Sequence, residues 1–449
     1  MRHLRIIFAL CCLIGLVALS ACGESASSTA GRVPQGDTGP QLAATLVASP
    51  TPGQSSTHPW GVASPGAGQG AGSNLPVGAL PSSFPHYFSF GVLNAPHTAS
   101  ALDEMRSENG TAFAFRYEVL SGTIDAQAVL QYMQESAWHK YTPAFIFDRL
   151  AASQIDDATF MRGYYTSWET LLRQVKIYGK PVVVMVEPTL WEELERASNG
   201  NDATQVAASV LASGYPDAQY PDTAQGLAQT LLHMRDLYAR NAVLALPVSS
   251  AVGDADVATD QRPDLDVTTM AQDETHFLKS VGLSGNPAGV STWDVLAGDL
   301  GGQDAANHGT WWDSYDRTFP NFVRYLSFIG QISQQTQRRV VLWQVPEGNQ
   351  YYTTMNNTPG HYQDNRVAYI LTHVPLLVDT GVVAVLFGPK DSDGTAITNV
   401  SHDGVVNSLP VNSYECNRCN THISHYADDD GGFLRIFIGI YMAHPALLS

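Results

Sequence analysis

Four carboxylates stand at the ends of short apolar runs in this sequence or within two residues after them, and their placement could support chemistry. They are Asp148, Glu187, Asp299 and Glu347. Two carboxyl groups that flank one bond can divide acid and base work, since one donates a proton while the other attacks or activates water. A charge at the end of an apolar run is costly unless it is paired or used. Each carboxylate is therefore either functional or a structural partner of an arginine such as Arg116 or Arg149.

Glu187 has the strongest case for a functional role among the four. It follows the apolar run 182–186 and precedes Pro188, and a proline ends a strand because it cannot donate a backbone hydrogen bond. A carboxylate in this position is predicted to face a site rather than the core. The alternative interpretation is a structural hydrogen bond that satisfies the carboxylate inside the protein.

Glu347 lies two residues beyond the run 339–345, and its orientation depends on which face of that strand turns inward. Strict alternation puts Glu347 on the same face as Trp343. The opposite choice turns Gln344 inward and leaves Glu347 off the pattern. Pro346 interrupts the strand between them, so both arrangements stay open.

Aromatic and polar side chains gather in the same segments as these carboxylates. Flat rings with a polar group can stack on the C–H faces of a sugar, and a few polar groups then fix its orientation. The alternative for each ring is packing in the core, but the polar neighbours of Trp311 and Trp312 favour a loop. The expected substrate-binding residues are Arg116, Asp148, Trp191, Trp311, Trp312, Trp343, Gln344, Asn349 and Tyr351.

Eight apolar runs alternate with segments of helical periodicity. The runs span residues 88–93, 112–117, 144–148, 181–187, 242–248, 293–297, 339–345 and 381–388. Continuous Val, Ile and Phe are typical of strands buried on both faces of a parallel sheet. The alternation predicts a single α/β domain of the (β/α)8 TIM-barrel class, with an open doubly wound sheet as the competing architecture. No Gly-x-Gly-x-x-Gly loop follows the first run, so a dinucleotide site is not supported.

The carboxyl ends of the predicted strands decide where the chemistry should lie. In a (β/α)8 barrel those ends form one mouth, which carries the active site. The four carboxylates should therefore converge there, with Glu187, Glu347 and Asp299 as the catalytic candidates. Helices predicted at 168–179, 224–238 and 319–334 would surround the barrel.

Composition narrows the range of partners. The chain has 449 residues, of which 44% are hydrophobic and 15% are charged, so it can bury a core. It carries 24 Lys and Arg against 42 Asp and Glu, a formal charge of −18. A nucleic-acid partner is not expected, because phosphate contacts need clustered basic residues. No cofactor is expected, and no Gly-x-Ser-x-Gly elbow points to a serine nucleophile.

The N-terminus resembles the export signal of a bacterial lipoprotein. Arg2 and Arg5 precede an apolar stretch at 6–19, and the segment 19–22 reads Leu-Ser-Ala-Cys, which is similar to a lipobox. The resemblance implies that residues 1–21 are a signal peptide and that Cys22 carries lipid. The chain would then be anchored to a membrane on its extracytoplasmic side. An ordinary cleaved signal and a single anchoring helix are the alternatives.

A change in composition marks the predicted start of the folded part. Residues 22–85 are rich in Gly, Ser and Pro and show no hydrophobic period, which predicts a disordered linker. The barrel is predicted to occupy residues 86–449.

The pairing of a Glu after the fourth run with a Glu after the seventh resembles the retaining glycoside hydrolases built on (β/α)8 barrels. The resemblance implies that Glu187 is the acid/base and Glu347 the nucleophile, with Val186 where those enzymes usually carry Asn. The segment 183–188 also resembles the Glu-Pro-Asp segment of inverting cellulases, with Thr189 in place of the Asp. The implied function is hydrolysis or binding of a polysaccharide or oligosaccharide. The alternatives are a non-catalytic carbohydrate-binding protein and a structural lipoprotein of the cell envelope.

Two cysteines and two histidines near the C-terminus leave three interpretations open. An exported chain favours a local disulfide, the Cys-x2-Cys-x2-His-x2-His spacing offers four zinc ligands, and free thiols are the third. The spacing is too compact for a zinc finger, and a bound metal is not the leading expectation. The four residues are Cys416, Cys419, His422 and His425.

Overall fold

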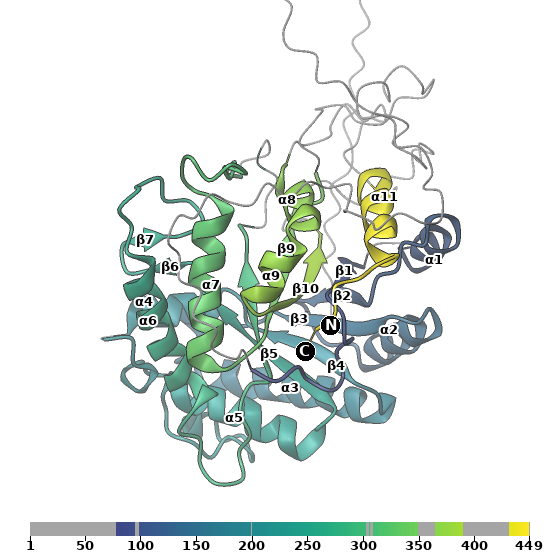
Figure 1. The fold of residues 1–449 in the computed structure, drawn as a ribbon. Helices are drawn as coiled ribbons and strands as arrows, with labels where there is room; N and C mark the ends of the chain where they lie inside the picture. The colour runs from purple at the N-terminus through teal and green to yellow at the C-terminus, as the bar shows by residue number, and fades with distance from the viewer. Residues whose placement is uncertain are drawn as a thin grey trace, which may run out of the picture. The chain divides into compact units, whose positions relative to one another are not determined.

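Eight parallel strands close into a barrel in the computed structural model of the chain (Figure 1). The structure describes residues 78–94, 98–198, 200–301, 305, 309–348, 364–388 and 431–448. The strands are β1 (Ser89–Leu93), β2 (Phe115–Leu120), β3 (Thr142–Phe147), β4 (Val182–Val186), β5 (Ala242–Val248), β8 (Val295–Asp299), β9 (Val340–Val345) and β10 (Val382–Phe387). Their order around the barrel is β1-β10-β9-β8-β5-β4-β3-β2. The predicted TIM-barrel fold is thereby confirmed.

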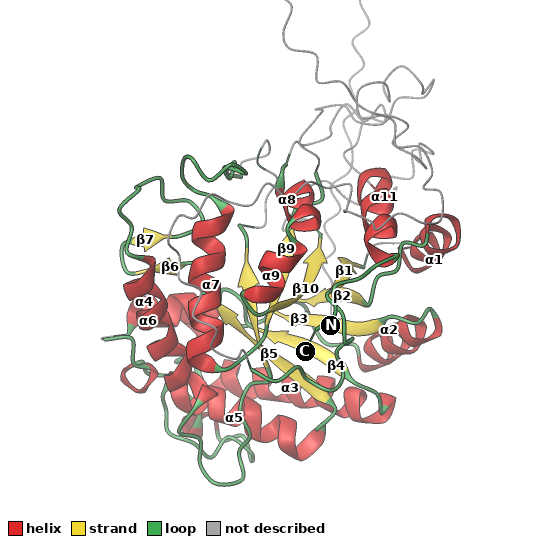
Figure 2. Ribbon diagram, viewed as in Figure 1, coloured by secondary structure: helices red, strands yellow, loops and turns green. Residues whose placement is uncertain are grey.

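Helices surround the barrel, as Figure 2 shows. They are α1 (Thr98–Asn109), α2 (Ala126–Trp138), α3 (Ala158–Tyr178), α4 (Leu190–Ala197), α5 (Ala224–Tyr238), α6 (Val267–Leu278), α7 (Phe322–Thr336), α8 (Arg366–Thr372), α9 (Val374–Asp379) and α11 (Gly431–Met442). A small antiparallel hairpin of β6 (Ala251–Val252) and β7 (Ala255–Asp256) follows β5. Within the described ranges, no helix is both long enough and apolar enough to cross a bilayer.

Local sequence explains where the helices begin and end. The carboxylate of Asp125 accepts hydrogen bonds from the N–H groups of Gln127 at 2.9 Å and Ala128 at 3.1 Å, so it caps the start of α2. At the end of α3, Gly179 adopts a left-handed φ of 74°, which glycine tolerates without strain. The apolar residues of α3 that recur at three- and four-residue spacing are buried against the barrel.

Three predicted strands differ from the structure by two residues or more: the third spans Thr142–Phe147 rather than 144–148, and two others are displaced as a whole. The second strand begins at Phe115 rather than at residue 112, and the sixth runs over Val295–Asp299 rather than 293–297. Trp293 is fully buried and its indole N–H donates to the carbonyl of Val281 at 2.7 Å, so its apolar character serves packing outside the ladder. The shift makes Asp299 the last residue of β8.

Contacts with the helices show which strand residues face outward. Arg116 of β2 lies over the ring of Tyr132 in α2, with 4.9 Å between the guanidinium carbon and the ring centre, so the next residue, Tyr117, faces the barrel interior. A Cβ on Gly298 of β8 would lie 3.0 Å from the hydroxyl of Tyr325 in α7, so Gly298 faces outward. Asp299 therefore faces the interior.

Candidate active site at the barrel mouth

The interior faces of β2, β8 and β9 bring three functional groups to the carboxyl end of the barrel. Tyr117 is fully buried, and Asp299 pairs in register with Trp343 of β9. Burial raises the pKa of Tyr117 well above its usual value, and the nearby carboxylates of Glu347 and Asp299 raise it further. The phenol therefore stays protonated and is a hydrogen-bond donor in the same region as two carboxylates.

A bulge in β9 settles the orientation of Glu347 that the sequence leaves open. Between Leu342 and Val345, β9 contains one residue more than the paired part of β10. Gln344, in this interval, has a positive φ of 48°. A bulge re-aims the side chains that follow it. Trp343 pairs in register with Asp299 and is 5% exposed, while Glu347 is 1% exposed and lies close enough to Tyr117 to raise its pKa, so both belong to the interior.

The end of β8 is held by its own turn and by α7. The Oδ1 of Asp299 accepts the N–H of Gly301 at 2.7 Å. The carbonyl of Asp299 accepts the hydroxyl of Tyr325 at 2.7 Å. These bonds hold Asp299 at the mouth, and its side chain keeps partial exposure to solvent.

A buried ion pair that the sequence analysis missed stabilises the same rim. Asp364 and Arg366 pair with each other at 0% and 1% exposure. Arg366 also donates to the carbonyls of Leu300 at 3.0 Å and Thr310 at 3.1 Å, while Asp364 accepts the N–H of Ala305 at 2.9 Å. The pair ties the loop after Asp299 to the start of α8. Its sequence signal, an acid and an arginine two residues apart before a helix, is too common to single out.

Glu187 lies beneath the loop after β3 and has no exposed surface. Its Oε2 accepts the N–H groups of Arg149 and Leu150, both at 2.9 Å, and its φ is 52°. Burial raises the pKa of Glu187 to about 8, against the lowering effect of those two N–H groups, and the neighbouring Asp148 raises it further. The carboxyl is thus held by main-chain donors rather than by the guanidinium of Arg149, and its catalytic role stays a prediction.

The placement of Glu187 leads to a testable dependence of stability on pH. Its carboxyl has a pKa of about 8 in the folded chain against an ordinary value of 4.5, so the folded state binds more protons between these values. The stabilisation is fully present below pH 4.5 and is lost as the pH rises through 8. Glu187→Gln keeps an oxygen for both N–H groups but cannot ionise. We expect the unfolding free energy of the variant, relative to that of the wild type, to rise by about 1.4 kcal/mol per pH unit across this window.

Urea unfolding at pH 5 to 8 measures this difference, with Glu192→Gln as the control because Glu192 is an exposed residue of α4. Parallel curves of unfolding free energy against pH for the wild type and Glu187→Gln would show that the carboxyl titrates normally.

Two further carboxyl groups, one on α4 and one on α6, are buried beside each other and were not predicted from the sequence. Glu195 of α4 and Glu274 of α6 are 4% and 1% exposed, and Glu274 accepts the N–H of Ser249, after β5, at 3.0 Å. Burial raises the pKa of Glu195 to about 7, and burial together with the Glu195 carboxylate raises the pKa of Glu274 well above its usual value. Each carboxyl group therefore influences the protonation of the other. The available signal was that Glu274 stands on the apolar face of α6 with Met270 and Ala271.

The predicted aromatic residues separate into buried and exposed positions. Trp191 is 2% exposed, lies 6.0 Å from Trp293 between ring centres and donates its indole N–H to Val186. Trp312 is 1% exposed and packs on Phe322. Trp311 is 44% exposed. Of these three rings, only Trp311 offers a free face to a ligand in this structure.

The remaining predicted binding residues lie in three places. Arg116 is buried on the helical side of β2, where it donates to Glu135 at 2.8 Å and to Asn94 at 2.6 Å. Asp148 follows β3 and lies beside Glu187. The others lie outside the described residues: Cys22, Asn349, Tyr351, Cys416, Cys419, His422 and His425. In the described part of the chain, no three His, Cys, Asp or Glu side chains gather as metal ligands.

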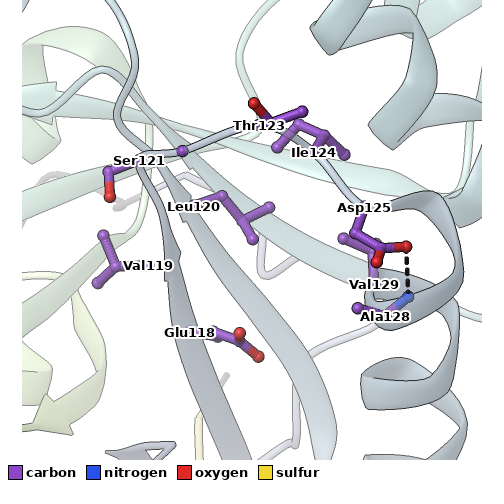
Figure 3. A pocket seen from close by; sticks show the side chains of 10 residues that line it. Glu118, Val119, Leu120, Ser121, Thr123, Ile124, Asp125, Ala128 and Val129 are labelled. Atoms are coloured by element: carbon purple, nitrogen blue, oxygen red, sulfur yellow. Dashed lines mark hydrogen bonds between the residues drawn. The ribbon is translucent and has the colours of Figure 1, made fainter. Parts of the chain in front are cut away.

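A small cavity lies between the end of β2 and the first turn of α2 (Figure 3). Its volume of about 230 Å³ is below the roughly 300–1,000 Å³ of typical ligand sites. Of its two carboxylates, Glu118 accepts a hydrogen bond from Asn94 at 3.2 Å and Asp125 caps α2. The cavity is therefore a feature of the rim, and the interior group of Tyr117, Asp299 and Glu347 remains the candidate site.

The fold and site define a TIM-barrel protein with titratable groups at its mouth. No protein-family model matches the chain, and no curated protein matches it in sequence. Among solved structures, the chain is similar to a family 5 xyloglucanase from Paenibacillus pabuli, with 12% identity, a TM-score of 0.41 and coverage of 72% of this chain and 96% of that one. It is also similar to the virulence factor SghA from Agrobacterium tumefaciens, with 10% identity, a TM-score of 0.40 and coverage of 80% and 98%. These values are too low to compare individual side chains.

Proposed function

We propose that the protein binds a carbohydrate at the barrel mouth and hydrolyses an O-glycosidic bond there. The observation that supports the proposal is the convergence of Asp299, Glu347 and Tyr117 from separate strands on one interior end. A pair of carboxyl groups on either side of a glycosidic bond is the usual requirement for its hydrolysis. Trp343, in register with Asp299, adds an aromatic face beside the pair.

The three groups have separate roles in this proposal. Glu347 is the carboxylate that attacks the anomeric carbon or activates water. Asp299, which is partly exposed, donates a proton to the leaving oxygen. Tyr117 stays protonated, and its buried hydroxyl is available to donate a hydrogen bond to the substrate. Glu187 acts as a positioning residue, because it holds the loop that begins with Asp148.

We also propose that the chain acts outside the cytoplasm and is anchored through lipid at Cys22. The support for this part comes from the sequence of residues 1–22.

A screen of polysaccharides and oligosaccharides for new reducing ends tests the activity. We expect Asp299→Asn to lower the rate on the best substrate by on the order of 10²-fold or more, because a general acid typically contributes that much. Glu192→Gln, an exposed carboxylate of α4, serves as the control and should retain full activity. Hydrolysis that is equally fast in Asp299→Asn would exclude Asp299 from the reaction.

A second candidate function is carbohydrate binding without turnover. The observations that favour it are the burial of Glu347, which is 1% exposed and argues against turnover, and the free face of Trp311, which is 44% exposed and can stack on a sugar. Saturable binding of a glycan, with no new reducing ends in the wild type, would support this second function.

A further inference from the structure

Three large apolar side chains are exposed at the end of the barrel opposite the mouth. Trp138, Ile177 and Leu237 are 84%, 64% and 49% exposed. They lie in the last turns of α2, α3 and α5, and α3 packs against both of the other helices (Figure 1). The amide of Asn241 donates to the carbonyls of Val175 and Lys180, both at 2.8 Å, and so joins the end of α3 to the start of β5.

Lysines accompany these apolar side chains. The chain has five lysines, and Lys140, Lys176 and Lys180 are all exposed at this end. No acidic side chain in the described ranges pairs with any of the three. We call the surface made by Trp138, Lys140, Lys176, Ile177, Lys180 and Leu237 the basal face.

The nearby acids have other partners. Glu135 of α2 pairs with Arg116 at 2.8 Å, and Asp236 of α5 pairs with Arg235 at 2.9 Å. The residues of the basal face thus include three lysines and no acid, on a chain whose formal charge is −18. Such a contrast favours contact with an anionic surface.

The N-terminal segment joins the barrel at this same end. The carbonyl of Gly78 accepts the Nε–H of Arg339 at 2.6 Å, and Arg339 directly precedes β9. Residues 1–77 are covalently continuous with Gly78. The C-terminus ends there as well, because Leu448 donates to the carbonyl of His86, before β1, at 3.0 Å.

We propose that the basal face docks on an anionic lipid surface and leaves the mouth pointing away from it. Trp138 takes the interfacial position that tryptophan prefers, and Ile177 and Leu237 enter the boundary between headgroups and acyl chains. The lysines bind the anionic headgroups. This docking rests on the described surface and does not depend on lipid at Cys22.

Tryptophan quenching tests the orientation of the bound chain. The full chain is mixed with vesicles of phosphatidylcholine and phosphatidylglycerol whose acyl chains are brominated. We expect quenching that is lost in Trp138→Phe and kept in Trp311→Phe, because Trp311 is exposed at the mouth. Vesicles of phosphatidylcholine alone should quench much less.

Substitution of the charges tests the attraction. The double variant Lys140→Gln/Lys180→Gln should dock more weakly by on the order of 30-fold, because each lysine near an anionic surface contributes about fivefold. Docking is measured by the quenching of Trp138. The control Arg262→Gln/Arg317→Gln removes the same charge from exposed loops at the mouth and should leave quenching unchanged.

Residues 1–77 are the same in every variant, so any membrane binding of their own does not produce a difference. Equal quenching in both double variants, quenching that survives Trp138→Phe, or no dependence on phosphatidylglycerol would overturn the proposal. Absence of any vesicle contact by this face would overturn it as well.

Discussion

Glu347→Gln is expected to lower kcat by on the order of 10³-fold on a glycan substrate, with a much smaller change in KM. The reason is that Glu347 is buried at the interior end of the barrel, where its carboxylate lies close to Tyr117 and Asp299. Glutamine keeps the size and one oxygen of the side chain, so binding is preserved. It cannot attack or accept a proton, and an interaction made only in the transition state is lost.

Single-turnover and steady-state rates across a range of pH measure this effect. The acidic limb of the pH profile should disappear in the variant if Glu347 is the group that must ionise. Tyr117→Phe is the matched companion, because it removes only a hydroxyl and should reduce kcat far less. A Glu347→Gln variant that keeps more than a tenth of the wild-type kcat would contradict the assignment.

Arg366→Met is expected to destabilise the chain by about 3–5 kcal/mol, because it leaves the buried carboxylate of Asp364 without its partner. Both side chains are at most 1% exposed, and no water can replace the lost charge. The substitution also removes the donors to Leu300 and Thr310 that hold the loop after β8. Urea unfolding at neutral pH measures the loss.

Two controls separate burial from charge. Arg196→Met breaks an exposed pair with Glu192, whose side chains are 58% and 39% exposed, and should change stability by less than about 0.5 kcal/mol. The double variant Asp364→Asn/Arg366→Met removes the isolated charge and should recover part of the loss. A single variant as stable as the wild type would mean that this buried pair does not stabilise the chain.

The site illustrates how a strand's two faces can defeat a prediction made from the sequence. Arg116 and Tyr117 are neighbours in β2, and both are buried. Arg116 is one of the nine residues predicted to bind substrate, yet it faces α2, while Tyr117 faces Glu347 and Asp299. In a parallel barrel both faces of a strand are covered, so polarity alone does not identify the interior face.

Glu187 also shows that a local sequence pattern does not predict what a buried side chain contacts. The sequence correctly marks it as a carboxyl at the end of a buried strand. Whether such a group meets a substrate or the backbone depends on a loop 38 residues earlier in the chain, whose N–H groups it accepts. The pairing in space of distant segments is not encoded in local patterns.

The sequence by itself determined the order of strands and helices, and so predicted the barrel ahead of an open doubly wound sheet, because that alternation follows from periodicity and burial, which are local properties. It also determined that carboxylates stand at the strand ends. Only the tertiary structure decided which of them share the interior with Tyr117, since a bulge at Gln344 and a boundary shift at Asp299 set their directions. Small changes in register redirect every side chain that follows, so the chemistry of the mouth depends on contacts between strands rather than on any single strand.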